Sequence, residues 1–388
     1  MKKTTTLRLR LRPTAESIVR GGHPWIFADS IKEQNRDGAA GELAIIFDRN
    51  DKFLAVGFYD PESPIRVRVI HVGKPVKVDA AFWKGHLDCA LAKRAAMFNG
   101  DTNGYRCIHG ENDGFPGLVL DRYADTYVFK IYTSAWKERV RDVKLLLENQ
   151  KLLTSIPTIV LRSSRNLRME DALVLRGAVT GSIEFLENGA RFEADVLRGQ
   201  KTGFFLDQRE NRQIVGSLAE GKDALNAFSF SGGFSVYAAR GGARSVTDLD
   251  ISAHALASAK RNFALNNVSH VHHETIQADT FEFLAGKPTR QFGLIILDPP
   301  SLAKREAEKA GALRAYRKLI QSALPWLARG GILVAASCSA HVTPDEFFTV
   351  ALEVTRAAGL KEFRRTGNPP DHPATFPEAR YLKCIYFR

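Results

Sequence analysis

Residues 294–300 read Leu-Ile-Ile-Leu-Asp-Pro-Pro, a short apolar run that ends in a carboxylate and two prolines. A continuous apolar run of this length, closed by prolines, is typical of a strand buried on both faces of a parallel sheet. The prolines remove backbone donors and fix an extended corner, so we expect the strand to end at Asp298. Few structural requirements explain two consecutive prolines there, which makes Asp298 a candidate ligand-binding residue.

Other expected strands lie on both sides of this run and alternate with helical patterns. The expected strands are residues 223–228, 245–250, 271–276, 294–298 and 331–337. Strands that alternate with helices predict an α/β fold with a doubly wound parallel sheet. Ligands of such sheets bind beyond the carboxyl ends of the strands, so the residues at those ends are the candidate site.

The first three strand ends favour a nucleoside-type cofactor. The first strand runs into a turn at Gly232, where the backbone can approach a ligand closely before a helix begins. Asp250 ends the second strand, where a carboxylate can accept hydrogen bonds from both hydroxyls of a ribose. Asp279 follows the third strand and could reach an adenine amino group. Each has a structural alternative, an ordinary turn for Gly232 and a helix cap for Asp250 and Asp279.

Cys338 ends the fifth strand between Ser337 and Ser339, beside Asp298 if the strand order is the usual one for this fold class. Cysteines are more often small buried hydrophobes, but this polar strand end favours a reactive thiol. A thiolate that adds to carbon 6 of cytosine activates carbon 5 for methylation. Asp298 can protonate or hydrogen-bond ring nitrogen 3 as charge develops. The sequence does not identify the base that removes the carbon 5 proton.

The first 200 residues indicate smaller, strand-rich domains. Residues 7–12 alternate Leu and Arg, as a half-exposed strand does, and a helical pattern begins near residue 74. The best short turn signal is Asn188-Gly189. The other expected elements are strands at residues 43–48, 53–59, 65–70, 118–121, 126–132 and 158–162, a helix at residues 137–147, and a hairpin at residues 182–196. These patterns predict a small β-barrel domain followed by a small α+β domain.

Composition bounds the class of protein. A chain of 388 residues is long enough for two or three domains. Lys plus Arg number 55 against 43 Asp plus Glu, and the net charge of +12 favours polyanionic partners such as nucleic acid. The four widely spaced cysteines indicate neither a disulfide framework nor a zinc site. The apolar runs are too short to cross a bilayer, so we expect a cytoplasmic protein with no bound metal.

These motifs together resemble one family, the ribosomal RNA large-subunit methyltransferases that carry an N-terminal PUA domain and make 5-methylcytosine. The stretches that carry the resemblance are residues 23–27 (His-Pro-Trp-Ile-Phe), 109–117, 201–209, 226–233, 298–300, 337–339 and 381–383. One departure is Ser301-Leu302 after the Asp-Pro-Pro, where some members have Lys-Phe. This departure leaves the target nucleotide open.

The resemblance implies a PUA RNA-binding domain at residues 1–73, a central α+β domain at residues 74–180 and a Rossmann-like class I methyltransferase domain at residues 181–388. It implies S-adenosylmethionine as cofactor, Cys338 as nucleophile, Pro299 and Pro300 at the substrate base, and 23S ribosomal RNA or its precursor as partner. A homodimer is also expected. The cofactor contacts that it implies are Phe204, Arg209, Asn226, Phe228, Ser231, Gly232, Asp250, Asp279 and Asp298.

Three alternatives stay open at this point. Methylation of an exocyclic amino group of guanine or adenine would use Asp298 and Pro299 and leave Cys338 incidental. A non-catalytic RNA-binding protein would have lost the cofactor. A nicotinamide oxidoreductase shares the fold class only, and the absence of G-x-G-x-x-G disfavours it.

Overall fold

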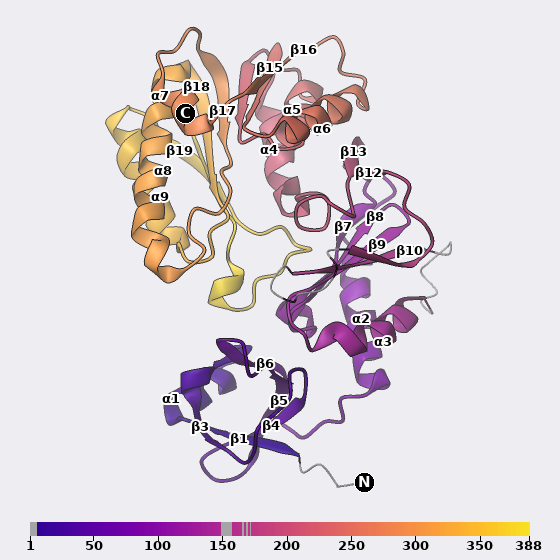
Figure 1. Cartoon of the computed structure of the whole chain (residues 1–388). Coiled ribbons are helices and arrows are strands. Elements are labelled where there is room, and N and C mark those ends of the chain that lie inside the picture. Colours follow the sequence, from indigo (N-terminus) through magenta and orange to yellow (C-terminus); the bar gives the residue numbers. More distant parts are fainter. Residues whose placement is uncertain (1–5, 149–156, 165–166, 168–169, 171) are drawn as a thin grey trace. The chain divides into compact units, whose positions relative to one another are not determined.

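The computed structural model describes residues 6–148, 157–164, 167, 170 and 172–388, and the chain forms two compact units (Figure 1). The N-terminal unit comprises Met1–Ile183 and Ala194–Gly203, and the C-terminal unit comprises Glu184–Glu193 and Phe204–Arg388. None of the helices in the described part of the chain is both long enough and apolar enough to span a bilayer.

The first sheet of the N-terminal unit has six strands in the order β2-β6-β5-β4-β1-β3. Leu7, Leu9 and Leu11 of β1 are buried, which confirms the strand expected from the Leu/Arg alternation. β1 pairs with β4 in parallel and with β3 antiparallel, and β4 and β5 form the expected hairpin. The elements are β1 (Leu7–Leu11), α1 (Pro13–Arg20), β2 (Trp25–Phe27), β3 (Ile31–Gln34), β4 (Leu43–Phe47), β5 (Phe53–Tyr59) and β6 (Ile65–Val72).

The second sheet of this unit has five strands in the order β11-β10-β9-β8-β7. Trp83 of α2 and Trp136 of α3 lie in one hydrophobic core with Phe115. The expected hairpin of β8 and β9, the helix α3 and the strand β10 are all present. The elements are α2 (Ala80–Ala95), β7 (Gly104–His109), β8 (Leu118–Tyr123), β9 (Thr126–Ile131), α3 (Trp136–Glu148), β10 (Thr158–Ser163) and β11 (Ala172–Arg176).

The C-terminal unit contains a seven-stranded sheet in the order β16-β15-β14-β17-β18-β20-β19. The first five strands of this order pair in parallel, as expected, and their bounds are β14 (Asp223–Ala227), β15 (Ser245–Asp250), β16 (His272–Gln277), β17 (Phe292–Leu297) and β18 (Leu327–Ser337). The helices are α4 (Arg209–Leu218), α5 (Gly233–Arg240), α6 (Ala253–Ala264), α7 (Thr280–Ala285), α8 (Lys309–Ala323) and α9 (Pro344–Ala357).

Successive residues of the central strands contribute to two different cores, one on each face of this sheet. Leu225, Ile295 and Leu333 belong to a core with residues of α8 and α9. Their neighbours Ala224, Leu294 and Val334 belong to a second core with residues of α4, α5 and α6. Both faces of the sheet are therefore covered by helices, and the doubly wound α/β class is confirmed.

Two strands of this sheet were not anticipated. β20 (Lys383–Phe387) lies between β18 and β19 (Glu362–Thr366) and runs antiparallel to both. All five residues of β20 are buried.

The expected hairpin of β12 (Ile183–Glu187) and β13 (Ala190–Ala194) is present as a separate two-stranded sheet. The backbone φ is 48° at Asn188 and 72° at Gly189, and both values lie in the left-handed region that a tight two-residue turn requires.

Candidate active site at the strand ends

Asn226 ends β14 in a buried polar network. Its Nδ2 donates to Asp248 Oδ1 at 3.0 Å and to Ser235 Oγ at 2.9 Å. Asp248 is itself buried and lies 2.7 Å from His273 Nε2. These contacts fix the Asn226 amide, so its Oδ1 points in a defined direction at the end of the first strand.

The loop after β14 is held in an unusual backbone conformation. Phe228 and Phe230 have φ of 59° and 48°, and left-handed conformations at residues other than glycine cost on the order of 1 kcal/mol each. Asp250 supports the loop, because its Oδ2 accepts from the Phe230 backbone N–H and its Oδ1 accepts from the Ser252 N–H, both at 2.9 Å. Ser252, rather than Asp250, caps α6. The carboxylate of β15 therefore connects the loop to the next strand end.

Gly232 is required by both conformation and space. Its φ is +72°, and an added Cβ would lie 2.8 Å from Ala259 Cβ. The preceding Ser231 is buried, and its carbonyl accepts from Asn262 Nδ2 at 2.8 Å. The glycine turn thus lies directly against α6, and α5 begins at Gly233.

The polar groups around this loop fit a nucleoside cofactor. Asn226 Oδ1 and Ser229 Oγ are buried, and no described residue provides either with a hydrogen-bond partner. Buried oxygens are almost always hydrogen-bonded in folded proteins, so these two acceptors at one strand end are suited to the donors of a bound cofactor. Asp279 lies at the end of the third strand, where its Oδ1 accepts from Glu282 N–H at 3.0 Å and caps α7.

Asp298 follows β17 and is positioned by a residue that the sequence analysis missed. Gln208 Nε2 donates to Asp298 Oδ1 at 2.9 Å. Gln208 is buried, and its Oε1 accepts from Asn211 Nδ2 at 2.6 Å. The contact joins residues 90 positions apart in the chain, and no local pattern predicts such a pair.

Cys338 lies beside the Asp-Pro-Pro corner. Leu297 of β17 pairs with Ala335 of β18, so the two strands end next to each other, as the usual strand order predicted. The Cys338 thiol is half-buried and lies 3.9 Å from the carbonyl oxygen of Pro299. Pro299 is buried, whereas Pro300 is exposed. The thiol therefore faces a polar strand end rather than packed hydrocarbon.

Ser339 joins the two turns that carry Asp298 and Cys338. Its Oγ accepts from the Leu302 N–H at 3.0 Å and lies 3.0 Å from the Tyr316 hydroxyl. Ser337 Oγ donates to the same tyrosine at 2.8 Å. Ser337 and Ser339 thus hold the residue between them against the Asp-Pro-Pro corner.

Lys383 of β20 fixes the same turn from its other side. Its Nζ donates to the carbonyl oxygens of Ser339 at 2.6 Å and Val342 at 2.7 Å. The side chain is buried, and burial lowers the pKa of Lys383 to about 8. A sequence motif contained this lysine, but its role depends on the antiparallel strand that was not predicted.

Two of the expected cofactor contacts lie in structural clusters. Arg209 is buried and forms a two-bond ion pair with Asp371, with Nη2–Oδ1 at 2.8 Å and Nη1–Oδ2 at 3.2 Å. The Phe204 ring packs against Phe192 and lies 4.8 Å from the guanidinium of Arg212. These contacts explain why both residues are buried, and the expected cofactor contacts of Arg209 and Phe204 stay predictions.

The parallel sheet with one antiparallel strand, the glycine turn after its first strand and the carboxylate after its second define a class I methyltransferase site. A family model described as S-adenosylmethionine-dependent methyltransferase matches residues 142–388, and one described as a PUA-like domain matches residues 9–71. In the part of the chain that the structure describes, no group of three or more His, Cys, Asp or Glu side chains could hold a metal ion.

The relatives narrow the class to one family. A ribosomal RNA large subunit methyltransferase of Deinococcus radiodurans is 53% identical, over 98% of this chain and 97% of the relative. Ribosomal RNA large subunit methyltransferase I of Shewanella denitrificans is 34% identical, over 98% of this chain and 99% of the relative. A solved structure assigned as a methyltransferase and complexed with SAH is 24% identical and has a TM-score of 0.87. The match covers 98% of this chain and 99% of that structure, and it shows that the fold is shared. The chain belongs to the ribosomal RNA large subunit methyltransferases, and its cofactor is S-adenosylmethionine.

Proposed function

We propose that this protein methylates carbon 5 of a cytosine in large-subunit ribosomal RNA. The observation that supports this chemistry is the Cys338 thiol 3.9 Å from the Pro299 carbonyl, directly after Asp298. The names of the two relatives support ribosomal RNA as the substrate, and the net charge of +12 suits a polyanion.

In this proposal Cys338 is the nucleophile. Its thiolate adds to carbon 6 of the cytosine, which forms a sulfur–carbon bond and moves electron density to carbon 5. Asp298, held by Gln208, donates the proton of its carboxyl to ring nitrogen 3 and neutralises the negative charge that develops there. The proton returns to Asp298 when the adduct breaks down. S-adenosylmethionine, when bound, supplies an electrophilic methyl group for carbon 5. Loss of the carbon 5 proton to a base then breaks the sulfur–carbon bond and returns the Cys338 thiolate.

The remaining groups act by position. Asn226, Phe228, Ser231 and Gly232 lie in β14 and the turn after it, Asp250 ends β15 and Asp279 follows β16, and these residues would hold the cofactor. Pro299 and Pro300 would contact the base. A base inside a duplex must be flipped out to reach the strand ends.

We further propose a PUA domain at residues 1–73, a central domain at residues 74–180 and a methyltransferase domain at residues 181–388, in a cytoplasmic homodimer. Light scattering of the purified protein tests the dimer.

Bisulfite sequencing tests the proposed product. Ribosomal RNA from a deletion strain should lack one 5-methylcytosine, which the wild type restores and Cys338→Ala does not. Cys89→Ala is the matched control, because Cys89 is an exposed thiol outside the strand ends. If Cys338→Ala still transferred labelled methyl groups from S-adenosylmethionine to the RNA at the wild-type rate, an exocyclic amino group would be favoured as the target.

A trapped adduct tests the covalent step. RNA that contains 5-fluorocytidine carries no removable proton at carbon 5, so the sulfur–carbon bond should persist after methyl transfer. We expect a complex of wild-type protein and RNA that survives denaturing electrophoresis, and the same complex with Cys89→Ala. Its formation by Cys338→Ala would contradict Cys338 as the nucleophile.

A further inference from the structure

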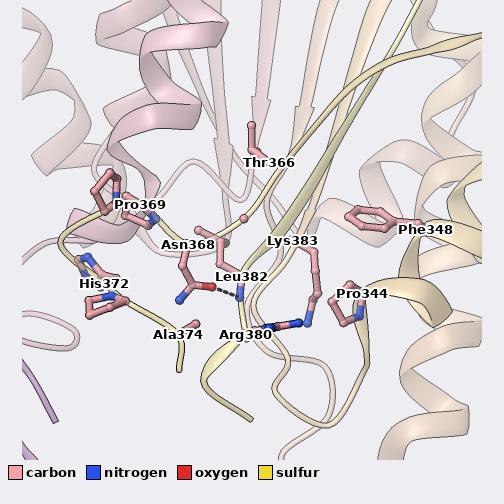
Figure 2. Close-up of a pocket in the computed structure, with 13 residues that line it drawn as sticks. Pro344, Phe348, Thr366, Asn368, Pro369, His372, Ala374, Arg380, Leu382 and Lys383 are labelled. Atoms are coloured by element: carbon pink, nitrogen blue, oxygen red, sulfur yellow. Dashed lines mark hydrogen bonds between the residues drawn. The ribbon is translucent and has the colours of Figure 1, made fainter. Parts of the chain in front are cut away.

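A pocket of about 370 Å³ lies in the C-terminal unit, beside the turn that follows Cys338 (Figure 2). It is lined by the start of α9, the segment after β19 and the start of β20, through residues that include Pro344, Phe348, Asn368, His372, Arg380 and Lys383. Neither Cys338 nor Asp298 lines it. The pocket is therefore adjacent to the proposed reaction centre and distinct from it.

The lining combines flat apolar surfaces with basic groups. Pro344 and Phe348 provide apolar surface, while Arg380 and Lys383 provide cationic groups. None of the lining residues is acidic. Volumes of about 300–1,000 Å³ are usual for ligand pockets, so this one is sized for a single small group rather than a chain segment. A flat ring with a phosphate is a group of this size. Its ring can lie against the apolar side chains, and its negative charge is complementary to the basic ones.

The wall of the pocket is held in place by hydrogen bonds. Asn368 Nδ2 donates to the Ala379 carbonyl at 3.1 Å. Its Oδ1 accepts from the Leu382 N–H at 3.4 Å (Figure 2). These bonds join the segment after β19 to the segment before β20. The chain's own hydrogen bonds thus hold this wall, and a pre-ordered wall lowers the entropic cost of binding.

Two sets of hydrogen bonds connect the pocket to the reaction centre. Lys383 lines the pocket and donates to the carbonyls of Ser339 and Val342, in the turn after Cys338. Thr366 also lines it, and its hydroxyl donates to Asn211. Asn211 donates in turn to Gln208, which holds Asp298. A group in the pocket would therefore rest against the elements that position both Cys338 and Asp298.

We propose that this pocket holds one nucleotide of the RNA strand next to the target cytosine, with its base against Pro344 and Phe348 and its phosphate at Arg380. The assignment of the neighbouring nucleotide to this pocket rests on the proposed function, which places the target itself at Cys338. Proteins read single-stranded RNA by stacking splayed bases on flat side chains and by charged hydrogen bonds to phosphate. The pocket would fix the register of the strand and so select which cytosine reaches Cys338.

Binding of mononucleotides tests the pocket without any methyl transfer. The four ribonucleoside 5′-monophosphates are titrated against the full-length protein, with the cofactor site saturated by S-adenosylhomocysteine, and saturation-transfer NMR reports the dissociation constants. We expect at least one to bind, and Arg380→Gln to weaken it about tenfold, the effect of losing one charged hydrogen bond. Arg329→Gln is the matched control, because Arg329 is an exposed arginine at the start of β18.

Two further variants separate this proposal from the proposed function. Pro344→Trp should fill the pocket and abolish mononucleotide binding, whereas Cys338→Ala should bind as the wild type does. In methylation of ribosomal RNA, Arg380→Gln should raise KM more than it lowers kcat. Absence of binding by all four nucleotides, or equal binding by Arg380→Gln and wild type, would overturn the pocket proposal. Full activity of Cys338→Ala would overturn the proposed chemistry and leave the binding result standing.

Discussion

Replacing Arg209 tests whether this buried arginine serves stability or the cofactor. Its guanidinium and the carboxylate of Asp371 are 3% and 0% exposed. Burial alone raises the pKa of Asp371, but the neighbouring His372 and Arg209 hold it well below its ordinary value. A carboxyl whose pKa is lowered on folding stabilises the fold above its unfolded pKa, and that stabilisation is lost as the pH falls.

The expected magnitude follows from what each substitution leaves behind. Arg209→Met keeps the apolar volume but removes both arginine hydrogen bonds from the buried Asp371 carboxylate and leaves it beside His372, at a cost of about 3 kcal/mol of unfolding free energy. Asp371→Asn also lowers the free energy of unfolding, because it leaves the Arg209 guanidinium buried without the carboxylate of Asp371. The double variant removes both charges, so we expect it to lose less than the sum of the single variants, by about 2 kcal/mol. Arg244→Met is the control, because Arg244 is 69% exposed in its pair with Asp223 and should matter little.

Hydrogen exchange of the β20 amides measures the free energy of unfolding of the C-terminal unit, because these buried amides exchange when that unit opens. The deficit of Arg209→Met should be largest at neutral pH and should shrink as the pH falls, because burial favours uptake of a proton by Asp371 once Arg209 is gone. Additive single effects would refute the reasoning. So would a variant of unchanged stability that has lost S-adenosylmethionine binding, since Arg209 would then act on the cofactor.

Three further predictions concern the strand ends. Gly232→Ala should cost about 2 kcal/mol, because it forces a side chain into a left-handed backbone and against Ala259, and calorimetry should show weaker S-adenosylmethionine binding. Asp250→Asn replaces one acceptor of the loop and should weaken cofactor binding about tenfold with an unchanged circular dichroism spectrum. Burial lowers the pKa of Lys383 from 10.5 to about 8 in the folded protein. Between these pH values the unfolded chain binds more protons than the folded one. The free energy of unfolding therefore rises with pH in this range, by at most about 3 kcal/mol. Lys383→Met should lack this rise in β20 exchange, and a rise that persists in the variant would assign it to another group.

The parallel part of the sheet was predictable because strand-like segments alternate with helical patterns, and because β17 and the second half of β18 are apolar runs that end in polar residues. That pattern also placed Asp298 and Cys338 at neighbouring strand ends, since parallel strands present their carboxyl ends at one edge. The turn at Asn188-Gly189 was equally local, and its two left-handed residues are those that the sequence favours.

What the sequence did not predict depends on contacts between distant residues. Gln208 and Lys383 are ordinary polar residues until the fold brings them to Asp298 and to the turn after Cys338. β20 is a five-residue strand with no helix after it, so the alternation of strands and helices does not indicate it. α1 carried a usable signal that was missed, because Pro13 stands at the first position of the helix, where proline is favoured.

The place of β20 in the sheet has a consequence for biosynthesis. Residues 383–387 supply the backbone partners for one side of β18 and for β19. While those residues are still inside the ribosomal tunnel, β18 has an unpaired inner edge and the turn after Cys338 lacks its lysine. The pairing of β18 and the lysine contact to the turn after Cys338 are therefore completed only once residues 383–387 have left the tunnel, whereas the sheets of the N-terminal unit can form earlier.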